Sequence, residues 1–283
     1  MPEIDTRVPG VVEEEVRAIY LSMYPEGTRR SVSRLFSWAI RFFSGRFADY
    51  QAIDARYHDF EHTLQGTLCL ARMLRGRQAA KAAPEASAKM FELALLAMLF
   101  HDTGYLKRKE DTEGTGAKYT VTHVERSGQF AAQLLGEKRF SATDIKTVQN
   151  MIQCTGVDAK LGGISFQSEI EKIAGFALGT ADLLGQMAAE DYVEKLPILF
   201  SEFAEAVKYT NDTTHFIGMF SSAGDLMEKT PVFWERFVQT KLDHEFMGLH
   251  RFLNDPYPSG QNHYLERIAA NMERLRGRKA ATA

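Results

Sequence analysis

The chain has 283 residues, of which 45% are hydrophobic, 25% charged and 11% aromatic, and its formal net charge at pH 7 is −3. A globule of this length buries roughly 75% of its unfolded surface, so it needs neither a disulfide nor a metal merely to fold. The near balance of charge excludes a general nucleic-acid binder, which would carry a basic stripe. The longest apolar run, Leu93–Phe100, is far shorter than the ~20 residues of a membrane-spanning helix.

The cellular setting follows from the cysteines and the first residues. Cys69 and Cys154 are too few for a disulfide framework, which favours a reducing compartment. The sequence MPEID begins the chain without a basic stretch and a following apolar run, so we expect no secretory signal. We therefore expect a cytoplasmic protein with no integral membrane segment and no nucleic-acid partner; the composition leaves a homodimer open.

Helix-forming residues recur along almost the whole chain, and period-2 alternation is nearly absent. We therefore expect an all-α fold with little or no sheet. No repeat and no low-complexity linker divides the chain, so a single domain over residues 1–283 is predicted. The predicted helices cover residues 11–24, 29–47, 59–75, 86–102, 122–136, 141–154, 168–190, 193–209, 215–229, 231–254 and 262–277.

Local signals support several of these boundaries. Gly104 stands where a C-terminal cap belongs, after the most apolar of the predicted helices. Thr122 with Glu125, and Ser141 with Asp144, have the spacing of a capping box. The predicted helix 29–47 mixes five arginines with aromatic residues; we favour a core helix with a basic outer face over a membrane-surface helix. The polar loop 108–119 is expected to border a site.

Histidines and carboxylates occur together in apolar surroundings in the first two thirds of the chain. Asp102 follows His101 at the end of the apolar segment FELALLAMLF, and Asp182 lies within FALGTADLLGQMA. A buried charge is costly unless it is paired or bound to a metal. Nitrogen and oxygen ligands of this kind suit Mn, Fe, Co, Ni, Zn or Mg, so one or two divalent metal ions are the expected cofactors.

Two further histidines stand four residues apart in the segment YHDFEH. If both are helical, His58 and His62 share one face. Asp59 is expected to cap the helix that begins there, which leaves His58 just outside the first turn and His62 within it. A role for Asp59 as a metal ligand is the alternative.

The order of H-x-x-x-H, then HD, then a distant Asp resembles the HD-domain superfamily of metal-dependent phosphohydrolases. The string YHDFEHTLQ is similar to the YHNxxH signature of the class I cyclic nucleotide phosphodiesterases. The resemblance implies a compact multi-helix bundle of the HD type, with a motif core at about 57–186 and C-terminal helices, 190–283, packed on it.

The resemblance also implies roles for individual residues. The first metal would be bound by four of them, His62, His101, Asp102 and Asp182. Asp102 would also bridge to a second metal and so count as catalytic, and His58 would be the general acid. HVERSG resembles an H-x-x-x-[SG] element that supplies a second-metal ligand, here His123.

The chain differs at several positions from the families that it resembles. Asp59 stands where the phosphodiesterases have Asn, and Tyr105 where they have another His. The paired histidines of the HD-GYP phosphodiesterases and the acidic pair of guanosine-tetraphosphate hydrolases are both missing. The organic part of the substrate is therefore left open, and the candidate contacts to it are Lys118, Arg126 and Gln186.

We predict a metal-dependent phosphohydrolase that cleaves a phosphoester, either a phosphodiester such as a cyclic nucleotide or a nucleotide monoester. The partner implied is thus a small-molecule phosphoester or nucleotide. Two alternatives remain open: a di-iron oxygenase of the HD type, and a non-catalytic, metal-stabilised nucleotide-binding protein.

Overall fold

The computed structural model describes residues 4–282 except 48, 157–158 and 211–215. Within these ranges the chain is helical, with two isolated β-bridges and no strand, so the predicted all-α class is confirmed. None of the described helices combines the length and the hydropathy needed to cross a bilayer. The α-helices are α1 (Pro9–Met23), α2 (Arg29–Phe43), α3 (Phe60–Ala79), α4 (Ala88–Phe100), α5 (His123–Glu137), α6 (Ala142–Ile152), α7 (Glu169–Met187), α8 (Tyr192–Tyr209), α9 (Ala223–Phe233) and α10 (His263–Thr282).

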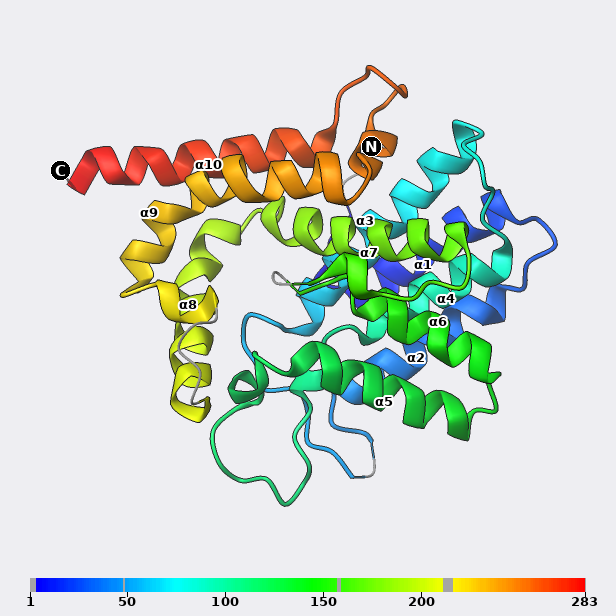
Figure 1. The fold of residues 1–283 in the computed structure, drawn as a ribbon, viewed down its shortest axis with the longest axis horizontal. Coiled ribbons are helices and arrows are strands. Elements are labelled where there is room, and N and C mark those ends of the chain that lie inside the picture. Colours follow the sequence, from blue (N-terminus) through cyan, green and yellow to red (C-terminus); the bar gives the residue numbers. More distant parts are fainter. Residues whose placement is uncertain (1–3, 48, 157–158, 211–215, 283) are drawn as a thin grey trace.

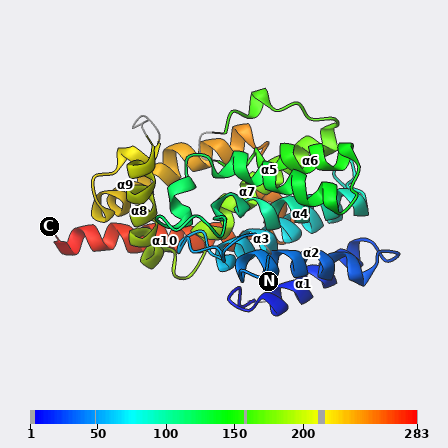
Figure 2. The ribbon, with the colours of Figure 1, turned by 90° about the horizontal axis from the view of Figure 1, so that it is seen from below.

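Short helical segments connect these elements. The 3₁₀ segments are η1 (Thr103–Tyr105), η2 (Gly116–Tyr119), η3 (Leu161–Gly163), η4 (Phe216–Met219) and η7 (Leu249–Leu253), and the π-helical segments are η5 (Trp234–Val238) and η6 (Lys241–Glu245). Helices α3, α4 and α7 form the centre, with α1 and α2 on one side and α5 and α6 on the other (Figures 1 and 2). Helices α8 and α9 stand at one end of the molecule in both views.

Two of the three central helices, α3 and α7, touch backbone to backbone at a pair of glycines. A Cβ atom added to Gly185 would lie only 2.7 Å from the backbone nitrogen of Gly66. No other residue at position 185 allows this approach without a shift of one helix. His62 lies one turn before Gly66, and Asp182 lies one turn before Gly185. The crossing therefore brings these two side chains face to face.

Most predicted helix starts agree with the structure. The side chain of Asp59 accepts a hydrogen bond from the backbone N–H of His62, as predicted for a cap, and Ser141 caps α6 in the same way. Thr122 makes no such bond, so that predicted capping box is wrong. Helix α2 buries its apolar face, including Phe36 and Phe42, in the core, which supports the predicted core helix with a basic outer face.

Gly104 is not a left-handed helix cap, because α4 ends earlier, at Phe100. Its role is close packing: a Cβ at this position would lie 2.0 Å from the carbonyl oxygen of His123. The backbone N–H of Gly104 also donates to the hydroxyl of Ser127 in α5, at 2.8 Å. The missing side chain thus lets η1 lie directly against the start of α5.

The predicted break between helices 215–229 and 231–254 is wrong. Helix α9 continues through Pro231 to Phe233, and the chain then passes directly into η5. Proline lacks the N–H that an α-helical turn requires, so the hydrogen bond of that position is missing within α9. The observed start is at Ser222, whose side chain accepts from the backbone N–H of Asp225; residue 215 lies outside the described residues.

We expect Gly185→Ala to lower the free energy of unfolding by about 1–3 kcal/mol, because its Cβ collides with the backbone of α3. Helix propensity alone would instead raise the free energy of unfolding by about 1 kcal/mol, because Ala favours a helix more than Gly does. Gly66→Ala is the matched control, since its Cβ would meet only the flexible end of Met98, at 3.0 Å. Urea unfolding of both variants measures the difference. Equal stability of Gly185→Ala and the wild type would contradict the close crossing.

Candidate functional site

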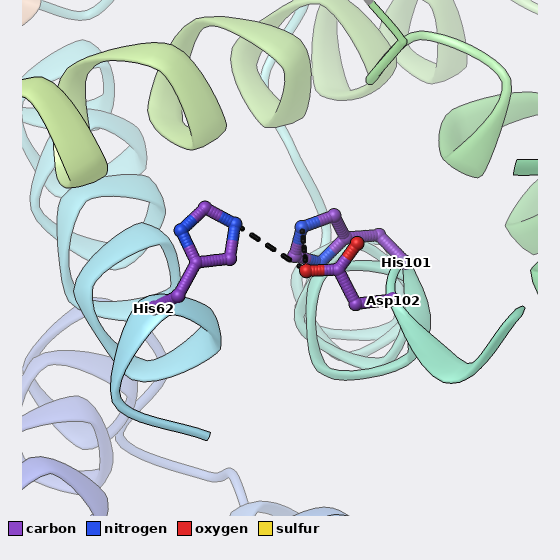
Figure 3. Close-up of side chains that lie close together, drawn as sticks. All are labelled: His62, His101 and Asp102. Carbon is purple, nitrogen blue, oxygen red and sulfur yellow. Dashed lines mark ion pairs between the residues drawn. The ribbon is translucent and has the colours of Figure 1, made fainter. Parts of the chain in front are cut away.

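Four side chains from α3, the end of α4 and α7 converge on one buried point. His62 Nε2 lies 3.3 Å from Asp102 Oδ2 and 3.3 Å from Asp182 Oδ1. His101 Nε2 lies 3.2 Å and 3.5 Å from the same two oxygens. Figure 3 shows His62, His101 and Asp102 pointing toward one another. The structure thus brings together the four residues that the resemblance assigns to a first metal.

Backbone carbonyls fix the ring nitrogens of two histidines. The Nδ1 of His101 is 2.7 Å from the carbonyl oxygen of Met98, and the Nδ1 of His123 is 2.6 Å from that of Thr120. Each Nδ1 must carry the proton that it donates, so each neutral ring keeps a lone pair on Nε2. Metal-binding histidines are commonly held in this way, because the hydrogen bond sets both tautomer and orientation.

Several polar atoms of the cluster are buried without a hydrogen-bond partner among the described residues, including His101 Nε2 and Asp102 Oδ2. Such atoms cost free energy unless something satisfies them. A metal with bonds of about 2.0–2.2 Å holds neighbouring ligand atoms roughly 3.0–3.5 Å apart, which matches the separations here. The buried group of His62, His101 and Asp102 could therefore hold a metal ion.

The charges of the two buried aspartates also favour a cation at this point. Burial alone would raise the pKa values of Asp102 and Asp182, but the neighbouring histidines hold both well below their usual range. Burial would lower the pKa of His62, yet the two carboxylates outweigh it and raise that pKa to about 10. Without a metal, the two carboxylates thus raise the pKa of both His62 and His101, so the cluster favours a positive charge at this point.

His123 lies at the edge of this cluster. Its Nε2 is 3.9 Å from Asp102 Oδ1, the carboxylate oxygen that does not face His62. Burial lowers the pKa of His123, which favours the neutral ring that a metal requires. The close packing of η1 on α5 at Gly104 is what places it there.

Next to the cluster, the structure shows an ion pair that was not predicted from the sequence. His58 Nδ1 lies 2.6 Å from Glu202 Oε2, and the other oxygen of Glu202 accepts from the backbone N–H of Tyr57 at 2.7 Å. Glu202 is 4% exposed. Burial would raise its pKa, but His58 and the backbone donors lower it. The signal for this pair in the sequence was the place of Glu202, three residues after Leu199 on the apolar face of α8.

Tyr105 lies between two of the histidines that line the cavity. Its ring stacks on His58 with 4.5 Å between centroids and on His123 with 4.8 Å. The tyrosine therefore acts as a spacer that fixes the distance between these two histidines.

The three candidate substrate contacts lie in different settings. Gln186 lines the cavity described below; its Nε2 is 3.3 Å from Asp182 Oδ1, and its oxygen accepts from the hydroxyl of Tyr57. Lys118 pairs with Asp111, and the guanidinium of Arg126 donates to two backbone carbonyls of the 104–106 segment. Neither Lys118 nor Arg126 lines the cavity, so the structure gives them no contact with a ligand there.

A cavity of about 350 Å³ joins these groups, within the size range of small-molecule sites. Its polar part includes His58, His62, Asp102, His123 and Asp182. Most of the other lining residues are apolar, and they include residues of α8, α9 and η5. A ligand in this cavity would contact both the cluster and the His58–Glu202 pair.

Comparison with protein families identifies the family of this chain. The model of the Npun_R2479-like family matches residues 109–253, so the chain belongs to that family. The matched range includes His123, Asp182 and Glu202 but begins after Asp102. No curated protein matches the chain.

We expect metal titration of chelator-treated protein to show a binding event that His101→Ala abolishes, because this change removes an Nε2 ligand from the cluster. His244→Ala is the control, since His244 is exposed and remote from the cluster in the sequence. Isothermal titration with Mn²⁺, followed by elemental analysis, gives the stoichiometry. Unchanged binding in His101→Ala would contradict the assignment.

The affinity for the metal should rise with pH. His62 is protonated in the metal-free protein up to a pKa of about 10 and must lose that proton to bind a metal. Between pH 7 and pH 9 the apparent association constant should therefore rise roughly tenfold per pH unit. Titrations at pH 7 in buffers of different ionisation enthalpy should show at least one proton released per metal ion. No proton release would mean that His62 stays protonated and is no ligand.

Proposed function

We propose that this member of the Npun_R2479-like family is a metal-dependent phosphohydrolase that cleaves a phosphoester. The observation that carries the proposal is the His58–Glu202 pair, 2.6 Å apart, beside a cluster of nitrogen and oxygen ligands that faces the same cavity. Hydrolysis of a phosphoester needs a cation for the phosphate and an acid for the leaving oxygen. This cavity offers residues suited to both.

The cation would be held by four side chains, His62, His101, Asp102 and Asp182. When bound, a divalent ion of the Mn, Fe, Co, Ni, Zn or Mg type would neutralise phosphate charge and lower the pKa of water at the site. His123 and the second oxygen of Asp102 are suited to a second, weaker ion. Applied to His123→Ala, the titration described above should lose the weaker step and keep the stronger one.

The chain's own residues would supply proton transfer and positioning. Glu202 accepts from the Nδ1–H of His58 and holds the ring at the cavity wall, where Tyr105 stacks on it. His58 would donate a proton to the leaving oxygen as the ester bond to phosphorus breaks. Gln186 would keep the carboxylate of Asp182 oriented, because its amide donates to that group.

The resemblance to the HD superfamily makes a cyclic nucleotide and a nucleotide monoester the first natural esters to assay. We further propose a small-molecule ligand and a cytoplasmic setting, which fits the two free, buried cysteines.

We expect His58→Ala to keep its metal and its melting temperature but to lose about 10²–10⁴ in rate on esters with a poor leaving group. Nitrophenyl esters, whose leaving group needs little protonation, should be hydrolysed comparatively well by this variant. Steady-state assays on both substrate types, with bound metal measured in parallel, separate the two effects.

Glu202→Gln should reduce the rate on the poor leaving group by a smaller factor, because the amide oxygen still accepts from His58. Glu205→Gln, one turn along α8 and bonded to Thr115 instead, is the matched control.

Equal loss of rate on both substrate types in His58→Ala would mean that His58 is a positioning residue and not the acid. Turnover of oxygen rather than of any phosphoester would favour an oxygenase, and nucleotide binding without turnover a binding protein.

A further inference from the structure

One part of the cavity lining, which we call the apolar compartment, is not used by the reaction chemistry. It is formed by the lining residues that follow Tyr192, and all of these except Thr230 and Lys241 are apolar. Large side chains dominate it, among them Leu196, Leu199, Phe203, Phe220, Phe233 and Phe237. The rings of Phe203 and Phe220 stack, as do those of Phe233 and Phe237.

The two polar exceptions already have partners within the protein. The hydroxyl of Thr230 donates to the carbonyl oxygen of Leu226, at 2.7 Å. The ammonium group of Lys241 pairs with Glu245 at 3.1 Å and lies 5.4 Å from the centre of the Phe246 ring. The compartment therefore has little with which to replace the water lost by a buried polar ligand.

The apolar lining favours the binding of some organic groups of a phosphoester over others. A nucleobase or ribose buried here would lose hydrogen bonds to water, which costs free energy for each unsatisfied group. An alkyl or aryl group has no such bonds to lose and gains from each methylene removed from water. Phe237, which lines the compartment, is 37% exposed, so the apolar surface extends to solvent.

The helical spacing explains why α8 carries this surface. Leu196, Leu199 and Phe203 recur at intervals of three and four residues, and therefore lie on one face of the helix. Glu202 is adjacent to that face and points its carboxylate to His58. One helix thus supplies both the partner of the candidate acid and the apolar wall beside it.

We propose that the compartment binds an apolar alkyl or aryl group of the ligand, so that the substrate is a phosphate ester of an apolar alcohol rather than of a nucleoside. This inference rests on the proposed phosphoester hydrolysis. The phosphate would lie at the histidine and aspartate cluster, and the apolar group would extend between α8 and the α9–η5 segment.

A series of alkyl phosphates from methyl to octyl, each below its micellar concentration, tests the compartment. With Mn²⁺ supplied, affinity by isothermal titration and kcat/KM by phosphate release should each rise, up to roughly fourfold per methylene, until the compartment is filled. Octyl phosphate should bind more tightly than AMP. Leu199→Gln, a half-buried and nearly isosteric change, should flatten the dependence on chain length.

Leu21→Gln is the matched control, because Leu21 is also half-buried but lies in α1 and does not line the cavity. It should keep the chain-length dependence of the wild type. Affinity that does not rise with chain length, tighter binding of AMP, or equal effects of the two variants would each overturn the inference. If nitrophenyl phosphates are still hydrolysed in that case, the proposed function stands. If octyl phosphate binds as expected but no phosphoester is hydrolysed, the compartment is supported and the proposed function fails.

Discussion

The candidate site depends on how closely two helices approach. Gly185 in α7 lies against the backbone of Gly66 in α3, at a distance that leaves no room for a Cβ atom. His62 and Asp182 stand one turn away from this contact on facing helices, and so meet at 3.3 Å. A wider crossing would leave a gap between them, and the cluster would lose two of its four members. The absence of a side chain at Gly185 is thus what makes the site compact.

The compactness creates an electrostatic problem that a bound cation would solve. Asp102 and Asp182 are held as carboxylates in the interior, and burial of a charge is tolerated only with a compensating partner. Histidines fixed by backbone carbonyls cannot all be protonated without repelling one another. A divalent ion would satisfy the carboxylates and the free imidazole lone pairs together, whereas a proton on His62 would satisfy them only in part.

The sequence predicted most of the helices because their signals are local, whereas the four-residue metal site was implied by the resemblance to the HD superfamily. Apolar periodicity marks the helices, Asp59 is placed to cap, and His101–Asp102 follows directly on an apolar helix. Glu202 was missed because its partner, His58, is 144 residues away, and amphipathicity shows that a face is buried without showing what it meets. The predicted break near residue 230 is absent because α9, which begins after the cap of Ser222, continues through Pro231 directly into η5.

The central claim is that His62, His101, Asp102 and Asp182 bind one divalent cation. The most direct measurement is a crystal structure of the protein with Mn²⁺, recorded with anomalous scattering. The account predicts an anomalous peak at the cluster, about 2.0–2.3 Å from His101 Nε2 and from an oxygen of each aspartate. A map without that peak, in which His62 instead donates hydrogen bonds directly to both carboxylates, would contradict it.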